Sequence, residues 1–318
     1  MKIYLSPLAS ADPLKALAML PSSTNADETA NPELRGSAAN RTKVFLNGIP
    51  ISNPVRNSQL NGIGFFSLLN TEMIKNEFIY PTNPPLIYGN TSAGLIDIET
   101  EDKLESNNYQ LSTTLASSGV SISQRINDKS FIQLYSNFMY SKVFLSVNPT
   151  LGERLKGFSS NDFGLNYHNE ISEKVSFNFY NYVLSENSDY LMNLFTWQDN
   201  ATGKTLRDFS ILNLKYNNSG NYLSLNLGSN FQRSNFSFGN ISSKSNQMQF
   251  YTSINYKHLF SEKMSLQAGL SNDYANNHYN DVVPEIYYAM SPSSPTIQAD
   301  TTLMNNLPEG YIYFRWNP

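Results

Sequence analysis

Few side chains in this sequence are of a type and spacing that could do chemistry. The histidines His168, His258 and His278 are scattered without metal-ligand spacing, so we expect them to be polar surface or lumen residues. The chain contains no cysteine, which removes thiolate ligands and a cysteine nucleophile. The sequence therefore predicts no metal site.

Two short motifs come near known catalytic or cofactor-binding patterns. Residues 90–94, NTSAG, approach the G-x-S-x-G of a nucleophile elbow, but Asn90 replaces the first glycine. Residues 62–67, GIGFFS, lack the third glycine of a dinucleotide loop. We therefore expect no catalytic residue, no cofactor and no enzymatic activity.

Acidic and aromatic side chains form the remaining groups. Four acids make a charge run that we interpret as a solvated hinge rather than a carboxylate pair: Asp97, Glu99, Glu101 and Asp102. Aromatic rings with a polar edge suit sugars and aromatic chelates. Five of them fall in expected loops and are the candidates for ligand contact, with packing among themselves as the alternative: Tyr190, Phe195, Trp197, Tyr287 and Tyr288.

Composition limits the classes of protein that can position these residues. Charged residues make up 15% of the 318 residues, below the roughly 25% of average soluble domains, yet the mean hydropathy is -0.39. The net charge of -4 provides no basic stripe, so nucleic acid is not expected as a partner. The first residues lack the apolar core of a signal peptide, which predicts either an intracellular chain or a missing true start.

The pattern along the chain changes near residues 101–108. Before this boundary we expect a compact α+β unit of short elements. Asp12 and Pro13 favour the start of a helix, and Asn47-Gly48 favours a tight turn between two strands. The other expected elements are a helix over 65–76 and strands over 33–37, 77–81 and 95–100.

After residue 108 apolar residues alternate with polar ones, which predicts about ten antiparallel strands. One strand places Leu223, Leu225 and Leu227 on one face, and its polar face is expected to tolerate an arginine at Asn226. The strand that begins at Val175 loses this alternation at Asn181.

Connections between these strands alternate between tight turns and longer stretches. Tight turns recur about every 45 residues at Asp128, Glu173, Asn218 and Glu262. Long irregular loops are expected over 142–160, 187–206, 234–245 and 276–308. This layout is typical of an outer-membrane β-barrel, whose apolar face contacts lipid. Aromatic residues close to the tight turns would form an interfacial girdle: Phe131, Phe177, Tyr222, Tyr256 and Phe260.

The first zone, from about Asp12 to Thr100, resembles the plug domain of TonB-dependent outer-membrane receptors. The resemblance lies in the order and spacing of short motifs, with Asn47 standing where the family usually has aspartate. Gly89 and Gly94 are expected to allow positive φ and close backbone approach. The residues that carry it are Arg35, Gly36, Asn47, Gly48, Tyr88, Gly89, Gly94, Ile96, Ile98 and Thr100.

This resemblance implies a plug domain over residues 1–103, truncated at its N-terminus, and part of a transmembrane β-barrel over residues 104–318. It implies energy-coupled uptake of a nutrient too large for porins, with no enzymatic step, at the bacterial outer membrane. The implied partners are outer-membrane lipid, a TonB-type energy-transducing protein that acts through a missing N-terminal segment, and a small-molecule, glycan or peptide cargo. Because a plugged barrel of this kind needs about 22 strands, the chain is expected to be a fragment.

Two other classes of protein remain open from the sequence. A porin or adhesin barrel without a plug would leave the first hundred residues unexplained. A soluble β-rich binding protein or enzyme would need a sheet that closes without lipid. Recovery of the protein in the outer-membrane fraction would separate the soluble class from the other two.

Overall fold

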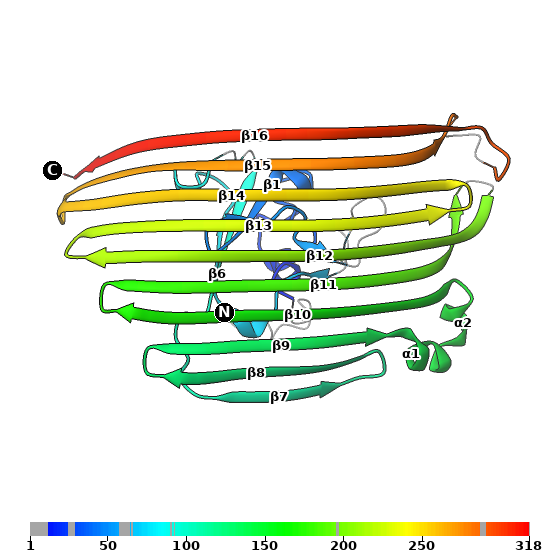
Figure 1. Cartoon of the computed structure of the whole chain (residues 1–318), viewed down its shortest axis with the longest axis horizontal. Coiled ribbons are helices and arrows are strands. Elements are labelled where there is room, and N and C mark those ends of the chain that lie inside the picture. The colour runs from blue at the N-terminus through cyan, green and yellow to red at the C-terminus, as the bar shows by residue number, and fades with distance from the viewer. Residues whose placement is uncertain are drawn as a thin grey trace.

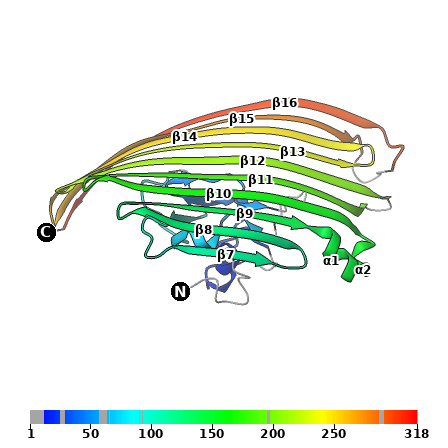
Figure 2. The same cartoon turned by 60° about the horizontal axis from the view of Figure 1, so that its bottom comes forward.

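A computed structural model describes residues 12–24, 29–56, 64, 66–89, 91, 93–194, 197–286 and 291–317. The chain has two parts, an N-terminal unit over residues 12–102 and a ten-stranded antiparallel sheet over residues 108–316. The sheet is arched, and the N-terminal unit lies on its concave side (Figures 1 and 2). We call the face toward this unit the inner face and the opposite, convex face the outer face.

The N-terminal unit is built around a four-stranded sheet in the order β2-β1-β6-β5. Its strands are β1 (Thr42–Leu46), β2 (Ile49–Pro50), β5 (Ile74–Tyr80) and β6 (Gly94–Thr100). Strand β6 runs parallel to β1 and antiparallel to β5, and Leu95, Ile96 and Ile98 are fully buried. A second pair, β3 (Val55–Arg56) and β4 (Phe66–Ser67), stands beside it.

Two local predictions for this unit are confirmed. Asn47 and Gly48 have φ of 50° and 78°, the left-handed backbone that a two-residue hairpin turn requires. The helix that follows Asp12 is present as a five-residue 3-10 helix, η3 (Lys15–Met19). Asp12 Oδ1 accepts hydrogen bonds from the backbone N–H groups of Leu14 at 3.0 Å and Lys15 at 3.2 Å. The acid therefore supplies the cap that its position predicts.

Two other local predictions are wrong. Residues 33–37 do not form a strand, because Arg35 and Gly36 both have positive φ, 55° and 73°, and make a turn. The helix expected over 65–76 is replaced by β4, the short 3-10 helix η5 (Thr71–Met73) and the start of β5. Apolar spacing in this stretch fits a helix, but pairing of β5 with the buried strand β6 overrides that preference.

The second part of the chain confirms the expected number of strands, with each strand paired to its sequence neighbours. The ten strands are β7 (Asn108–Thr113), β8 (Ser117–Asn127), β9 (Ser130–Tyr140), β10 (Leu155–Ser172), β11 (Val175–Leu194), β12 (Trp197–Asn218), β13 (Asn221–Phe238), β14 (Ile241–Ser261), β15 (Met264–Pro284) and β16 (Thr296–Trp316). Among the described residues, β7 and β16 each pair with one neighbouring strand only.

The tight turns all lie at one end of the sheet, as predicted, but the long loops at the other end are mostly absent. Residues 187–194, 197–206, 234–238 and 241–245 belong to paired strands, and β13 and β14 are joined by residues 239–240 alone. Residues 142–160 contain two short helices, α1 (Ser141–Val147) and α2 (Pro149–Gly152). Here apolar and polar residues do not alternate regularly, while backbone pairing continues. We call this the long-strand end and the opposite end the tight-turn end.

The polarity of the sheet is inverted relative to that of a water-soluble sandwich. On β13, Leu223, Leu227 and Phe231 face outward and are 39%, 39% and 42% exposed. Asn226 and Asn230 face inward and are buried. The predicted apolar face is therefore confirmed as the outer face. Within the described ranges, none of the helices is long and apolar enough to cross a bilayer.

The alternation of β11 continues through Asn181, although the sequence loses it there. The Asn181 Nδ2 atom donates hydrogen bonds to Asp208 Oδ1 at 2.8 Å and Ser210 Oγ at 2.9 Å. These three residues form a polar spot on an otherwise apolar outer face. The expected aromatic girdle is partly wrong, because Phe131 is buried on the inner face, where its ring stacks on His168, and Tyr222 shares the inner face with Asn226.

Candidate functional site

The contact between the N-terminal unit and the inner face of the sheet is the candidate functional site. At its centre the Asn47–Gly48 turn touches both parts of the molecule. Asn47 Oδ1 accepts the backbone N–H of Thr100 at 2.9 Å, and Asn47 Nδ2 donates to Thr100 Oγ1 at 2.8 Å. Asn47 Nδ2 also donates to Asn178 Oδ1 at 3.2 Å. One side chain therefore joins β1, β6 and β11.

A row of amide side chains on the inner face receives this turn. It consists of Gln133, Asn166, Asn178, Asn213 and Asn226, and we call it the amide row. Its members are linked in two groups by side-chain hydrogen bonds of 2.8 to 2.9 Å: the first three on β9 to β11, and the last two on β12 and β13. The Asn47 side chain and backbone carbonyl join the two groups through Asn178 and Asn213.

The amide row also holds backbone groups of the N-terminal unit. Asn213 Nδ2 donates to the Asn47 carbonyl at 2.8 Å, Asn166 Nδ2 to the Glu101 carbonyl at 3.1 Å, and Gln133 Nε2 to the Glu72 carbonyl at 3.2 Å. These bonds are all between neutral groups. Asn226 is 6% exposed and its amide lies 3.6 Å from where a Cβ of Gly48 would be, so the expectation that this position tolerates arginine is wrong.

Two arginines anchor the segment that follows β2. Arg207 on β12 is 2% exposed and donates from Nη1 to the Asn53 carbonyl at 2.6 Å and from Nη2 to the Ser52 carbonyl at 2.7 Å. Arg56 reaches in the opposite direction and pairs with Asp162 on β10 at 3.0 Å. Burial opposes the charge of Arg56, but Tyr182 and Asp162 favour it, and its pKa is raised overall. Two arginines thus hold this segment at two fixed points of the contact.

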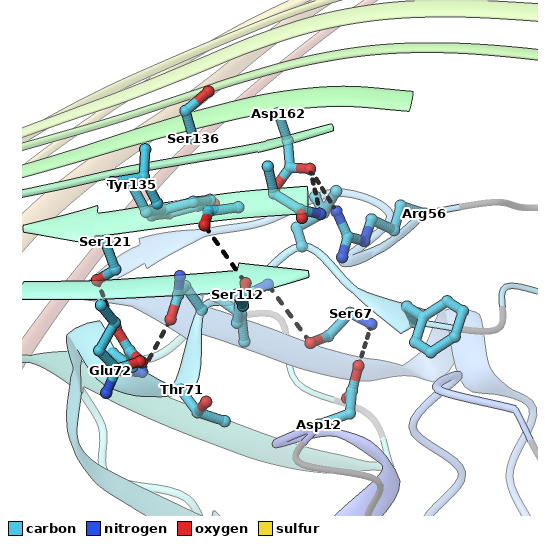
Figure 3. A pocket seen from close by; sticks show the side chains of 18 residues that line it. Asp12, Arg56, Ser67, Thr71, Glu72, Ser112, Ser121, Tyr135, Ser136 and Asp162 are labelled. Atoms are coloured by element: carbon cyan, nitrogen blue, oxygen red, sulfur yellow. Dashed lines mark hydrogen bonds and ion pairs between the residues drawn. The ribbon is translucent and has the colours of Figure 1, made fainter. Parts of the chain in front are cut away.

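A polar cavity of about 330 Å³ lies between the N-terminal unit and strands β7 to β10 (Figure 3). Asp12 Oδ2 accepts the backbone N–H of Ser67 at 2.6 Å on one side of it, and the Arg56–Asp162 pair lies on another. Ser121 Oγ donates to a carboxylate oxygen of Glu72 across the cavity. The polar lining leaves a water-accessible gap beside an otherwise packed contact.

The remaining residues of the plug-like motif are close to this contact. The Tyr88 hydroxyl donates to Asp97 Oδ2 at 2.5 Å, and its ring packs on Phe45 with centroids 4.7 Å apart. Gly89 and Gly94 do permit close approach, because a Cβ would meet the carboxylate of Glu309 on β16 at Gly89 and the side chain of Leu34 at Gly94. Positive φ was expected at both positions and is found at neither.

The acidic run is not a uniformly solvated hinge. Asp97 is 7% exposed within β6, and burial raises its pKa although the hydrogen bond from Tyr88 acts to lower it. Asp102 at the end of the run does face solvent, where Lys75 Nζ donates to it at 2.7 Å. On the adjacent strand β5, burial together with the charge of Asp12 raises the pKa of Glu77 to about 8. The sequence did not reveal that Asp97 is buried, because the acids of the run simply alternate along one strand.

Of the five aromatic ligand candidates, the structure describes Tyr190 and Trp197. Trp197 is 6% exposed and packs on Phe238 with ring centroids 4.5 Å apart, and Tyr190 lies half-buried beside this cluster. Trp197 therefore presents little surface to a ligand. Phe195, Tyr287 and Tyr288 lie outside the described residues.

The three histidines lie on different strands, with His168 on β10, His258 on β14 and His278 on β15. Across the described residues, no three acidic or histidine side chains are grouped so that they could hold a metal ion. Asn90 and Ser92 of the NTSAG stretch, and half of GIGFFS, lie outside those residues.

The amide row and the Arg207 anchor were not identified from the sequence. Period-two alternation places asparagine on the inner face, but it cannot say which of many asparagines meet the N-terminal unit. Arg207 carries one usable signal, because it is a cation at an inward position of a strand, as is Lys215.

Comparison with known proteins finds similarity of fold only. No protein-family model and no curated protein matches the chain. The outer membrane transporter YddB from Escherichia coli matches with a TM-score of 0.61 and 10% identity, over 99% of this chain and 53% of that one. FpvA from P. aeruginosa, in a pyoverdine–iron complex, matches with a TM-score of 0.63 and 10% identity, over 90% and 44%.

The ferric-catecholate import receptor Fiu from E. coli K12 matches with a TM-score of 0.53 and 10% identity, over 95% of this chain and 64% of that one. The chain thus spans 44% to 64% of the length of these three structures. It has the fold of outer-membrane import receptors and transporters, over about half of their length.

Proposed function

We propose that this chain forms the plug and part of the barrel of a TonB-dependent outer-membrane receptor, which takes up a nutrient too large for porins. Residues 1–103 are assigned to the plug and residues 104–318 to the barrel. The similarity of fold to import receptors supports this assignment, and so does the order of the plug-like motifs.

One observation carries the proposal, namely the position of a folded unit on the polar face of a sheet whose other face is apolar. Lipid supplies no hydrogen-bond partners, so a sheet that crosses a bilayer must place apolar side chains outward. The N-terminal unit then occupies the lumen, where the amide row can bind it. A soluble β-rich protein does not account for exposed outward residues such as Leu227 and Phe231.

The contact geometry fits a plug that must be held and then moved. A neutral hydrogen bond contributes about 0.5–1.5 kcal/mol net, because water replaces it when it breaks. The amide bonds are one part of a contact that also includes packed apolar side chains and two arginines, and they can break under force without leaving unpaired charges in the lumen. We assign Arg35 and Gly36 to shaping the turn that precedes the plug strand. The residues assigned to holding the plug strand and its turn in place are Asn47, Gly48, Tyr88, Gly89, Gly94 and Thr100.

Cargo is assigned to the long-strand end, beyond the N-terminal unit. Tyr190 is half-buried there, and in the sequence Phe195 falls between β11 and β12, and Tyr287 and Tyr288 fall between β15 and β16. Trp197 acts through packing on Phe238, which would hold the neighbouring rings in place. The proposed partners are outer-membrane lipid, this cargo and a TonB-type energy-transducing protein.

Fractionation and thiol labelling test the proposal together. The chain, exported behind a signal peptide, should be recovered in the outer-membrane fraction. A cysteine at Asn240, in the exposed turn at the long-strand end, should react with a membrane-impermeant thiol reagent in intact cells. A cysteine at Glu173, in an exposed tight turn, should stay protected. Soluble recovery would contradict the membrane assignment, and reversed labelling would contradict the orientation.

A barrel without a plug is separated by a second measurement. If the N-terminal unit occupies the lumen, limited proteolysis of the membrane-inserted protein should spare residues 42–56. Cleavage there at the same rate as in the unfolded chain would favour a porin or adhesin barrel.

A further inference from the structure

The outer face carries a group of three cations on adjacent strands at the long-strand side of its apolar residues. It consists of Lys204 on β12, Arg233 on β13 and Lys244 on β14, which we call the cationic patch. In the sheet register Asn235 is opposite both Lys204 and Lys244, and Arg233 lies two residues from Asn235 on the same strand. With strands about 4.8 Å apart, the Cα atoms of the two lysines are about 10 Å apart. All three side chains are exposed.

Apolar residues end directly beneath this patch. On β12 the next outward residue from Lys204 toward the tight turns is Leu206, and on β13 the next from Arg233 is Phe231. Their side chains are 53% and 42% exposed. The Phe231 ring meets Phe250 of β14 in an edge-to-face contact with centroids 5.5 Å apart. On the proposed function, on which this inference rests, these rings mark the upper boundary of the lipid-facing band. The patch then lies at the depth of the lipid headgroups.

The cations of the patch are not neutralised by acids. In the described part of the chain, no carboxylate forms an ion pair with any of the three, and Arg233 Nε instead donates to Asn246 Oδ1 at 3.0 Å. Among the outward acids nearby, Asp208 on β12 accepts from Asn181, and Asp300 on β16, two strands from Lys244 in the same row, accepts from Asn280. Asp189 on β11 is a further outward acid, opposite Thr202 rather than Lys204.

We propose that the cationic patch binds the phosphate groups of anionic lipid headgroups in the leaflet at the long-strand end. The guanidinium of Arg233 can bind phosphate oxygens through two donors, and the two lysines supply point charges on either side. Basic residues just beyond an apolar segment attract anionic lipid. A lipid is the favoured source of the phosphate because its acyl chains cover the adjoining apolar residues, which a free phosphate ion leaves bare.

Spin-labelled lipids test this binding in phosphatidylcholine vesicles that contain the inserted protein. The measurement is the immobilised fraction of spin-labelled phosphatidylglycerol relative to spin-labelled phosphatidylcholine. We expect the unmodified chain to prefer the anionic lipid about threefold, and K204Q/R233Q/K244Q to reduce this preference to about one. The matched control R41Q/K43Q/K103Q removes three charges from the N-terminal unit and should keep the preference. Added salt should weaken the preference, because exposed charges are screened.

Each outcome decides a different question. An unchanged preference in K204Q/R233Q/K244Q, or an equal loss in the control, overturns the cationic patch as a lipid site. Loss of the preference on adding inorganic phosphate at constant ionic strength would show that free phosphate binds instead, which also overturns it. Failure of the unmodified chain to enter the vesicles contradicts the proposed function itself.

Discussion

The N-terminal unit buries mainly apolar side chains, whereas the ten-stranded sheet buries a mixture of polar and apolar ones. The unit surrounds its central strand β6 with apolar neighbours on both sides, so that Leu95, Ile96 and Ile98 are all fully buried. On its inner face the sheet buries asparagine, serine and arginine together with apolar and aromatic side chains such as Tyr182, Leu184 and Ile211, and it leaves leucine and phenylalanine exposed on its outer face. The sequence of a strand therefore does not decide which of its faces is buried, because burial depends on what covers each face.

This difference also separates the forces that hold the two parts. Apolar burial stabilises the unit without directional requirements. The contact between unit and sheet combines directional hydrogen bonds, those of the amide row and Arg207, with a buried apolar cluster that includes Ile49 of the unit and Ile211 of the sheet. Substitutions on the two faces of the sheet should therefore lower stability for different physical reasons.

Replacing Arg207 by methionine should have the largest effect. The Ser52 and Asn53 carbonyls would lose charged donors in a buried site, which should lower the free energy of unfolding by about 3 kcal/mol. Denaturant unfolding in detergent micelles measures this loss. Arg233→Met is the matched control on the exposed outer face and should change stability by less than about 0.5 kcal/mol. Equal losses would mean that Arg207 is not an anchor.

An arginine at Leu225 on the outer face should cost roughly 2–4 kcal/mol if this residue lies near the bilayer midplane. The reason is transfer of a charge into lipid, so the cost should appear in vesicles and be small in denaturant-free detergent. Asn235→Arg lies on the same strand and the same face, beyond the apolar residues, and should be tolerated. Similar folding yields for both variants in vesicles would contradict the lipid-facing assignment.

Stability should depend on pH through Glu77 in the N-terminal unit. Its pKa is raised from 4.5 to about 8 in the folded state, so the folded state binds the proton more tightly. The resulting stabilisation is complete below its ordinary pKa and is lost as pH rises through about 8. Between about pH 5 and about pH 9 the free energy of unfolding should therefore fall, and in Glu77→Gln this fall should be about 2 kcal/mol smaller. Glu105→Gln, at an exposed acid, should leave the pH dependence unchanged.

Shortening one member of the amide row should have the smallest effect. Asn213→Ala removes the donor to the Asn47 carbonyl and should cost about 1–2 kcal/mol. Faster hydrogen exchange at residues 47–56 would show that the unit has loosened from the sheet. Asn200→Ala, on the exposed outer face of the same strand, should leave exchange unaltered. No change in either variant would mean that the amide row does not hold the unit.

Local features of this protein were largely readable from the sequence. The Asn47–Gly48 turn, the Asp12 cap and the tight turns follow from backbone preferences of a few adjacent residues. The outward direction of Leu223 and its neighbours follows from period two. The strand count followed as well, because turn signals are local and recur.

Features that depend on distant partners could not be predicted in this way. The helix expected over 65–76 failed because pairing with β6 decides the state of that segment. Long loops were expected where residues such as Asn187 and Lys204 pair in strands whose apolar and polar residues do not alternate regularly. The burial of Asp97 depends on Tyr88 and the surrounding strands.

The sequence by itself determined that the second part of the chain forms strands with one apolar face and one polar face. Only the tertiary structure decided which asparagines bind the N-terminal unit, that Arg207 holds the segment after β2, and that the polar face is the covered one. The physical reason is that alternation is a property of one strand, whereas burial and hydrogen bonding are properties of two surfaces that meet.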